Sequence, residues 1–385
     1  MAITVDSLYK NAPKLYHMKM LAGYEGLNNL VQWVHIIEDD DVSSFLHGHE
    51  LVFTSGIGGK GEGWLLNFAK KLHKVGTAAF IINIGPYLQQ IPQEVINFCD
   101  WAKMPLFTIP WETRMVDMTR DFCHRIVKKE QVEDSMATTI KNIIFKVGDL
   151  ESQVAQMERY GYQRDSGFSF VAMSMESENM RFFSQKMNQL KIYAEKTARS
   201  FHGHYISFSY ESYYIIALLN YEKDDMSQFV KLIDDFSRLT PEVKVYMGVS
   251  PNTLGIDHLS GNFKKALDAL AMSKRKKEKV VFYDELGFYK ILLNIEDKSM
   301  LKLYYDDILG KLIAYDEENS TNLVEFLKVY LEYDASPQMV SEKTFVHRNT
   351  VTYQLKKIHK ITGRNPMEME ARVQFYICFQ IRDIL

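Results

Sequence analysis

Cysteine is scarce in this chain, and its scarcity argues against disulfide frameworks and zinc sites. Only three of the 385 residues are cysteine: Cys99, Cys123 and Cys378. They lie far apart and lack metal-ligand spacing, so we expect reduced, buried thiols. The short histidine clusters at 47–50 and 202–204 have no cysteine or aspartate cluster at matching spacing. The sequence therefore predicts no metal and no cofactor.

Long apolar runs are also missing. No run approaches eighteen apolar residues, and no charged-then-apolar leader precedes the first domain, so we expect a cytoplasmic protein with no membrane partner. A composition of 46% hydrophobic and 25% charged residues is typical of a globular protein with two or three domains.

The chain as a whole has no excess of basic residues, since its formal net charge is -3. Its last part does have such an excess. Residues 321–385 hold 9 basic and 7 acidic side chains, which leaves 37 basic and 42 acidic residues elsewhere. Between residues 336 and 364, six Lys and Arg face a single acid, Glu342. Only this end suits a polyanionic partner.

The same segment predicts a helix-turn-helix. Ser336 is a good N-cap and Pro337 a good first helical residue, and this helix should end near Lys343. A second helix should run from about His347 to Gly363. Its apolar face holds Val351, Leu355, Ile358 and Ile361.

The polar face of this second helix has the chemistry to bind double-stranded DNA. Arg, Asn, Thr and Tyr side chains can contact base edges, and lysines can contact phosphates. The predicted DNA-binding residues are His347, Arg348, Asn349, Thr350, Thr352, Tyr353, Lys356 and Lys357. An amphipathic helix at 323–331 and a last helix capped by Asn365, Pro366 and Glu368 should complete a four-helix core. The alternatives are an ordinary charged surface helix, or an interaction scaffold that keeps only the fold.

The N-terminal region predicts an α/β domain. Apolar strands at 50–54, 77–84 and 105–109 alternate with helical patterns around 64–72 and 92–103, which implies a parallel sheet covered on both faces. Small ligands bind at the carboxyl ends of such strands. Here those ends are residues 54–56, 84–85 and 110–111.

A glycine-rich loop, residues 56–61, matches G-x-G-x-x-G after a strand and before a helix. No Asp or Glu follows the next strand to bind a ribose, and the loop lacks the residues of a P-loop. We therefore favour a loop that lines another small-ligand pocket. The alternative is a dinucleotide-binding enzyme, or a nucleotide cyclase built on the middle of the chain.

Between these regions lies a heptad pattern that predicts a dimerising coiled coil. Its steps alternate between four and three, and a homodimer, or a higher oligomer, would let two helix-turn-helix units reach two half-sites. The predicted seam is Met136, Ile140, Ile143, Val147, Leu150, Val154 and Met157.

Residues 167–295 predict an α+β module of nucleotide-cyclase size and order. The strands should lie at 168–175, 205–208, 213–220, 243–250 and 280–283, with helices at 183–201, 227–239 and 262–274. The hairpin turn at 209–212 lacks paired glycines beside acidic residues, so we expect no catalysis.

Four stretches together resemble the bacterial purine-catabolism-regulator (PucR-like) family: L-A-G-Y-E-G-L-N-N-L-V-Q-W-V-H-I-I-E at 21–38, H-G-H-E-L-V-F-T-S-G at 47–56, M-P-L-F-T-I-P at 104–110 and V-H-R-N-T-V-T-Y-Q-L-K-K-I at 346–358. Gln354 stands where relatives usually have arginine. Ser55 stands where they often have threonine.

The resemblance implies a non-enzymatic, ligand-responsive regulator of genes for purine, nitrogen-compound or amino-acid catabolism. It implies a sensor at 1–125, a linker at 126–161, a degenerate GGDEF-like domain at 162–300, as in sugar-diacid regulators, and a helix-turn-helix domain at 315–385. The effector would be a purine derivative, a ureide or an amino acid, and its expected contacts are Glu38, Thr54, Ser55 and Gly56. We expect it to shift the packing of a long helix from Met136 to Met157, and so the spacing of the two DNA-binding domains.

Overall fold

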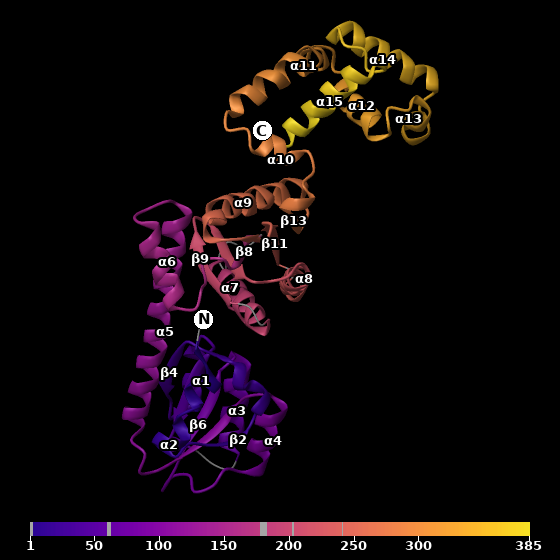
Figure 1. Cartoon of the computed structure of the whole chain (residues 1–385). Helices are drawn as coiled ribbons and strands as arrows, with labels where there is room; N and C mark the ends of the chain where they lie inside the picture. Colours follow the sequence, from indigo (N-terminus) through magenta and orange to yellow (C-terminus); the bar gives the residue numbers. More distant parts are fainter. Residues whose placement is uncertain (1–2, 60–62, 178–182, 202–203, 241) are drawn as a thin grey trace. The chain divides into compact units, whose positions relative to one another are not determined.

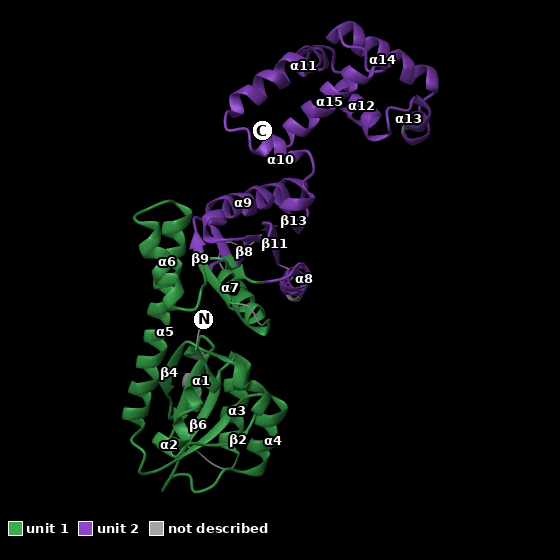
Figure 2. Cartoon of the chain, viewed as in Figure 1, with its two compact units in different colours: residues 1–166, 185–208, 216–220 green, residues 167–184, 209–215, 221–385 purple. Residues whose placement is uncertain are grey.

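The computed structural model describes residues 3–59, 63–177, 183–201, 204–240 and 242–385. Figure 1 traces the chain, and Figure 2 colours its two compact units. Unit 1 holds residues 1–166, 185–208 and 216–220, and unit 2 holds residues 167–184, 209–215 and 221–385.

Unit 1 begins with an α/β domain built on a five-stranded sheet. The strand order is β2-β7-β6-β5-β4. Pairing is parallel between β4 and β5, β5 and β6, and β6 and β7, whereas β2 runs antiparallel to β7. The strands are β2 (Lys19–Ala22), β4 (Trp33–Ile36), β5 (Glu50–Thr54), β6 (Ala79–Ile84) and β7 (Leu106–Pro110).

Helices cover both faces of this sheet because successive strand residues point to opposite sides. In β5, Leu51 and Phe53 join a core with α1, α2 and α5, while Val52 joins a second core with α3 and α4. The helices are α1 (Val5–Tyr9), α2 (Ala12–Tyr16), α3 (Trp64–Val75), α4 (Gln93–Trp101) and α5 (Met115–Ile144). Short elements complete the domain: β1 (Ile3–Thr4), β3 (Leu30–Val31) and the 3₁₀ turns η1 (Tyr24–Asn28) and η2 (Asp40–Phe45).

The predicted order of strands and helices is confirmed, but the sheet is mixed rather than wholly parallel. The departure is β2, a four-residue edge strand. Its sequence, K-M-L-A, is too short to carry a period. Strand β2 is therefore recognised by its pairing with β7 in the structure and not by a hydrophobic pattern in the sequence.

The predicted continuous coiled-coil helix is wrong. The chain leaves the helix after Ile144, because Lys146 and Gly148 adopt left-handed conformations with φ of 56° and 78°. Asp149 then caps a new helix, α6 (Leu150–Arg159), by accepting a 2.8 Å hydrogen bond from the Ser152 amide. Helix α6 packs back on α5, and the Gln156 amide donates to the Ser135 hydroxyl across the pair.

This helical hairpin buries most of the predicted seam inside the chain. Five seam positions are at most 6% exposed: Met136, Ile140, Ile143, Val154 and Met157. Val147, in the loop, is 56% exposed. A 3.5-residue period indicates that one helix packs along another. Here the second helix is α6 of the same chain.

The middle segment has the predicted order of elements. They are β8 (Gly167–Ser177), α7 (Phe183–Ser200), β9 (His204–Tyr210), β10 (Tyr213–Leu219), α8 (Lys223–Leu239), β11 (Val243–Val249), β12 (Thr253–Leu254), η4 (Ile256–His258), α9 (Leu259–Lys276), β13 (Val280–Phe282), η5 (Tyr283–Glu285) and α10 (Tyr289–Leu293). Strand β11 pairs antiparallel with β8 and parallel with β13, and β12 pairs antiparallel with β8. Neighbouring strands β9 and β10 form the predicted hairpin, whose turn places Glu211 at φ 51°.

Five helices at the end of unit 2 enclose one core. They are α11 (Lys298–Asn319), α12 (Leu323–Glu332), α13 (Pro337–Thr344), α14 (Arg348–Thr362) and α15 (Met369–Arg382). Helix α11 supplies Ile308, Leu309 and Leu312 to this core, although most of it precedes the predicted start at residue 315. Its Asp316 carboxylate also accepts from the Leu323 and Val324 amides and so caps α12.

Most predicted helix ends in this domain are confirmed. Ser336 accepts from the Met339 amide at the start of α13, and Gly363 ends α14 at φ 74°. The last helix starts later than expected, at Met369. Asn365 lies in a turn instead. Its side-chain oxygen accepts a hydrogen bond from the Met367 backbone amide, and its side-chain NH₂ group donates one to the Glu368 carboxylate.

The three cysteines are free, with Cys99 and Cys378 buried and Cys123 half-buried. Burial raises the pKa of the Cys99 thiol to about 12. No helix in the described part of the chain has the length and apolarity needed to cross a membrane.

Candidate functional site

Helix α14 begins with a local cap that presents its first turn to solvent. His347 lies at the N-cap in an extended conformation, and its Nδ1 accepts a 3.2 Å hydrogen bond from the Asn349 amide. Before it, the Ser341 hydroxyl donates to the Val346 carbonyl and holds α13 against the turn. His347, Arg348, Asn349 and Thr350 are all exposed.

The exposed face of α14 lies opposite its core face. Val351, Leu355 and Ile358 are fully buried among α11, α12, α13 and α15. Asn349, Tyr353, Lys356 and Lys360 follow at steps of four, three and four and are exposed, Tyr353 by 67%. Because side chains three and four apart share one helix face, these groups form a single polar stripe.

Besides His347, two of the predicted DNA-binding residues are engaged within the domain. The Thr352 hydroxyl donates to the Arg348 carbonyl at 3.1 Å. The Lys357 ammonium lies 4.8 Å from the centre of the Tyr315 ring of α11, in a cation–π contact. Lys357 is therefore directed toward α11, while its neighbour Lys356 is exposed.

Phe345 was missed by the sequence reasoning. It lies in the turn between α13 and α14, at φ 56°, and its side chain is 95% exposed. Single exposed apolar side chains are common on protein surfaces, and what distinguishes this one is its place in the turn where the polar face of α14 begins. The signal in the sequence was an aromatic residue inside a turn.

At the carboxyl ends of the N-terminal strands, the structure brings the predicted effector residues together. One oxygen of the half-buried Glu38 carboxylate accepts from the Ser55 hydroxyl at 2.9 Å, and the other accepts from the Thr54 hydroxyl at 3.0 Å. The Ser55 amide donates to both. Gly56 follows at φ 80°. Glu38 thus orders the turn that leaves β5.

Close packing explains the glycines of the predicted loop that the structure describes. A Cβ on Gly58 would lie 1.8 Å from the Glu38 carbonyl oxygen, and one on Gly59 would lie 2.4 Å from the Trp64 indole. Lys60 and Gly61 lie outside the described residues. These glycines are required by the chain's own backbone and by Trp64.

Aromatic side chains border the same edge of the sheet. Tyr87 and Trp111 are about half exposed, and their ring centres lie 5.9 Å apart in an edge-on arrangement. Gly85 makes room for this pair, because a Cβ there would lie 2.2 Å from the Trp111 ring. The edge therefore combines an ordered carboxylate turn with exposed rings.

Replacing Glu38 by glutamine should destabilise the N-terminal domain by about 1–3 kcal/mol, because an amide cannot accept all the bonds that the carboxylate accepts. Urea unfolding followed by tryptophan fluorescence measures this directly, since Trp33, Trp64, Trp101 and Trp111 are the chain's four tryptophans. The exposed Glu94→Gln is the control and should leave the midpoint unchanged. Equal midpoints for both variants would show that the Glu38 contacts add nothing to stability.

Comparison with known protein families finds matches for the N-terminal α/β domain and for the C-terminal helical domain. A helix-turn-helix domain is defined by α13 and α14. Residues 323–381 match the PucR C-terminal helix-turn-helix domain, and residues 10–126 match the purine catabolism regulatory protein-like family. The chain therefore carries both PucR-type domains, one at each end.

Named relatives match over parts of their length. The chain is 24% identical over 259 residues to the proline-responsive transcriptional activator PutR of Bacillus subtilis, which covers 65% of this chain and 62% of that protein. The DNA-binding transcriptional activator AdeR of the same organism is 28% identical over 130 residues, 33% of this chain and 31% of that one. The purine catabolism regulatory protein of B. subtilis is 29% identical over 107 residues, 28% of this chain and 20% of that one. The chain thus spans less than two thirds of each.

Among solved structures, a regulator of polyketide synthase expression from Bifidobacterium adolescentis superimposes with a TM-score of 0.32 at 16% identity. The match covers 65% of this chain and 92% of that chain.

Proposed function

We propose that this protein is a ligand-responsive transcriptional regulator of the PucR type that binds double-stranded operator DNA through α14. The observation that carries the proposal is the polar stripe of Asn349, Tyr353, Lys356 and Lys360, exposed opposite a fully buried core face. A stripe that begins with Asn and continues with lysines can pair with base edges near its start and with phosphates farther along.

The relatives support the kind of regulation. Their names describe a proline-responsive activator, a DNA-binding activator and a regulator of purine catabolism. We propose that this chain likewise acts in the cytoplasm and controls genes for the catabolism of purines, other nitrogen compounds or amino acids. An enzyme built on the glycine loop is disfavoured because Gly58 and Gly59 are already packed against Glu38 and Trp64.

We propose the four-part organisation of sensor (1–125), linker (126–161), non-catalytic GGDEF-like domain (162–300) and DNA-binding domain (315–385), with α11 as an additional support of the last. The carboxyl edge of the first sheet is the proposed effector surface, with Glu38, Thr54, Ser55 and Gly56 shaping it. The exposed Tyr87 and Trp111 rings favour a flat effector there.

A homodimer or higher oligomer is also proposed, since a helix-turn-helix protein reads two half-sites as a symmetric pair. The seam residues are mostly buried within one chain, so we do not assign the dimer contact to them. Light scattering of the full chain measures the molar mass, and a monomer on a full operator would contradict this proposal.

The adjacent lysines of α14 give a matched test of DNA binding. Lys356→Ala should weaken binding to every duplex and lower the slope of log K against log salt by about 0.9, because one phosphate contact is lost. Lys357→Ala should leave the slope unchanged, since that ammonium lies over the Tyr315 ring. Fluorescence anisotropy with duplex DNA at several salt concentrations measures both. Salt-independent binding, or equal slopes for wild type and Lys356→Ala, would contradict the proposed face.

A further inference from the structure

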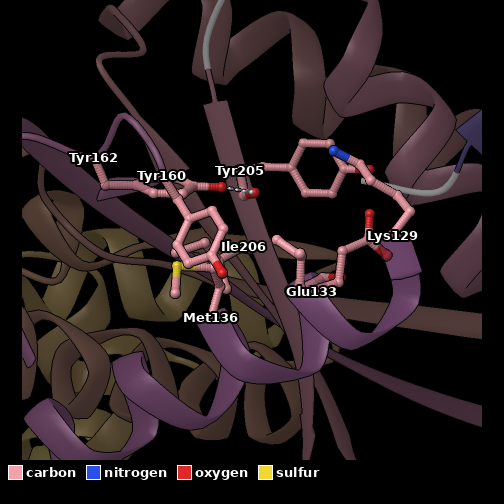
Figure 3. A pocket seen from close by; sticks show the side chains of 9 residues that line it. Lys129, Glu133, Met136, Tyr160, Tyr162, Tyr205 and Ile206 are labelled. Atoms are coloured by element: carbon pink, nitrogen blue, oxygen red, sulfur yellow. Dashed lines mark hydrogen bonds between the residues drawn. The ribbon is translucent and has the colours of Figure 1, made fainter. Parts of the chain in front are cut away.

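Unit 1 contains a pocket that none of the sites above uses. It has a volume of about 80 Å³ and lies between the middle of α5, the segment after α6, and β9 (Figure 3). Its walls are Lys129, Val132, Glu133, Met136, Tyr160, Tyr162, Tyr205, Ile206 and Ser207. Charged, phenolic and apolar groups therefore meet in one small space.

The pocket matches a small metabolite in size. A cavity must have about 10–15 Å³ to hold one water molecule, so this pocket has room for several. A molecule with a similar number of non-hydrogen atoms would fill it. That is the size of a small amino acid.

One end of the pocket suits a carboxylate. Lys129 is half-buried, and burial together with the nearby positive charge of Arg199 lowers its pKa. A bound anion would offset both effects. The Tyr205 hydroxyl accepts a 2.9 Å hydrogen bond from Arg199 Nε, which leaves its own O–H free to donate to a carboxylate oxygen.

Arg199 adds a second reason to expect an anion. Its two terminal guanidinium nitrogens are buried and donate no hydrogen bond within the described residues. The nearest carboxylate oxygen in its ion pair, on Glu195, is 4.0 Å from Nη2. Positive charge behind the Tyr205 ring is therefore only partly compensated.

The other charged wall suits an ammonium group. Glu133 follows Lys129 by four residues, so both side chains leave the same face of α5, with Cβ atoms about 5–6 Å apart. Figure 3 shows them on one helix, with the tyrosines on the facing segments. Tyr160 and Tyr162 add ring faces and edges, and the Tyr162 hydroxyl is anchored on the Tyr205 carbonyl at 3.3 Å. Aromatic rings next to a carboxylate attract cations.

We propose that this pocket binds a small zwitterionic α-amino acid, with its carboxylate at Lys129 and the Tyr205 hydroxyl and its ammonium at Glu133 and the tyrosine rings. The amino acid's side chain would contact Val132, Met136 and Ile206. The site is separate from the carboxyl edge of the sheet, and its occupant would join α5 to β9.

The first test is calorimetric titration of the full chain, without DNA, using L-alanine, L-proline, propionate and propylamine. Both amino acids should bind, and the two singly charged probes should bind at least about tenfold more weakly, because each meets only one charged wall. Absence of amino-acid binding at millimolar concentration, or equal binding of propionate and alanine, would overturn the proposal.

The second test uses variants of α5. Lys129→Met and Glu133→Gln should each weaken amino-acid binding at least about tenfold, whereas Lys129→Arg should retain it. The exposed neighbours on the same helix, Lys128→Met and Asp134→Asn, are matched controls and should bind as wild type does. Circular dichroism and tryptophan fluorescence confirm that each variant is folded. Wild-type binding by folded Lys129→Met and Glu133→Gln would place any ligand elsewhere.

Two further measurements separate this inference from the proposed function. If Ser55→Ala abolishes amino-acid binding and Lys129→Met does not, the ligand sits at the sheet edge and the pocket proposal fails. DNA binding is measured on the same preparations without amino acid. If the wild-type protein binds DNA but no amino acid, the pocket proposal fails and the proposed function stands. If it binds amino acid but no DNA, the proposed function fails and the pocket proposal stands.

Discussion

Replacing Asn349 by alanine is expected to remove much of the protein's ability to distinguish its operator from other DNA. Asn349 is exposed in the first turn of α14, where His347 holds its backbone amide and leaves the side chain directed to solvent. An asparagine amide pairs bidentately with adenine, and such a pair contributes about 1–3 kcal/mol of discrimination. Arg348→Ala should give a loss of the same size if the guanidinium pairs with guanine.

The measurement compares a duplex selected by the wild-type protein with a scrambled duplex of equal length. For Asn349→Ala and Arg348→Ala, affinity should fall for the selected duplex and much less for the scrambled one. Lys357→Ala is the control, since its charge is engaged by Tyr315. Equal losses on both duplexes would mean that these residues contact the DNA backbone and carry no sequence information.

Replacing Leu355 by alanine is expected to unfold the DNA-binding domain selectively. Leu355 is 0% exposed and packs in the core that α11 to α15 share. Truncating a buried leucine costs about 2–5 kcal/mol, a large part of the stability of a small domain. The loss should fall on this domain and spare the N-terminal one.

Two optical probes distinguish the domains. Far-UV circular dichroism follows all helices, whereas tryptophan fluorescence follows only residues 33–111, which contain all four tryptophans. For Leu355→Ala, part of the dichroism should be lost at lower urea while the fluorescence midpoint stays constant. Tyr353→Ala, two residues away and 67% exposed, should change DNA binding without shifting either curve. A shared shift of both probes would mean that the two ends of the chain unfold together.

The helix-turn-helix was predictable because its signals are local. Ser336, Pro337 and Gly363 act within a few residues of the helix ends that they set, and the period of Val351, Leu355 and Ile358 identifies the buried face. The strands and helices of the first domain followed in the same way from runs of apolar residues. Helix α11 was missed because its apolar residues, among them Leu303, Ile308 and Ile313, are spread around the helix and mark no single face.

The seam shows what a periodic pattern leaves undetermined. The spacing from Met136 to Met157 predicts a packed helix face but not which helix covers it. Two backbone conformations, at Lys146 and Gly148, turn the second half of the pattern back on the first. The prediction of one long helix from Met136 to Met157 failed because the spacing of apolar residues carries no signal of left-handed backbone conformations between them.

Of the candidate sites, one could be predicted from the sequence and one could not. Glu38 and Ser55 were singled out by a family motif, and the structure adds that they bind each other. The pocket at Lys129 could not be found in the sequence, because its walls come from residues 129–136, 160–162 and 205–207. Only the fold brings those segments together.

Helix α5 is 30 residues long and therefore spans about 45 Å. Met118, Phe122 and Ile126 fix one part of it in the core of the first domain, while Met136 and Ile140 are buried near its other end. A rod of this length acts as a lever: a tilt of about 10° at one end moves the other by about 8 Å. Small rotations of α5 in the core of the first domain would therefore become displacements of several ångströms at its far end.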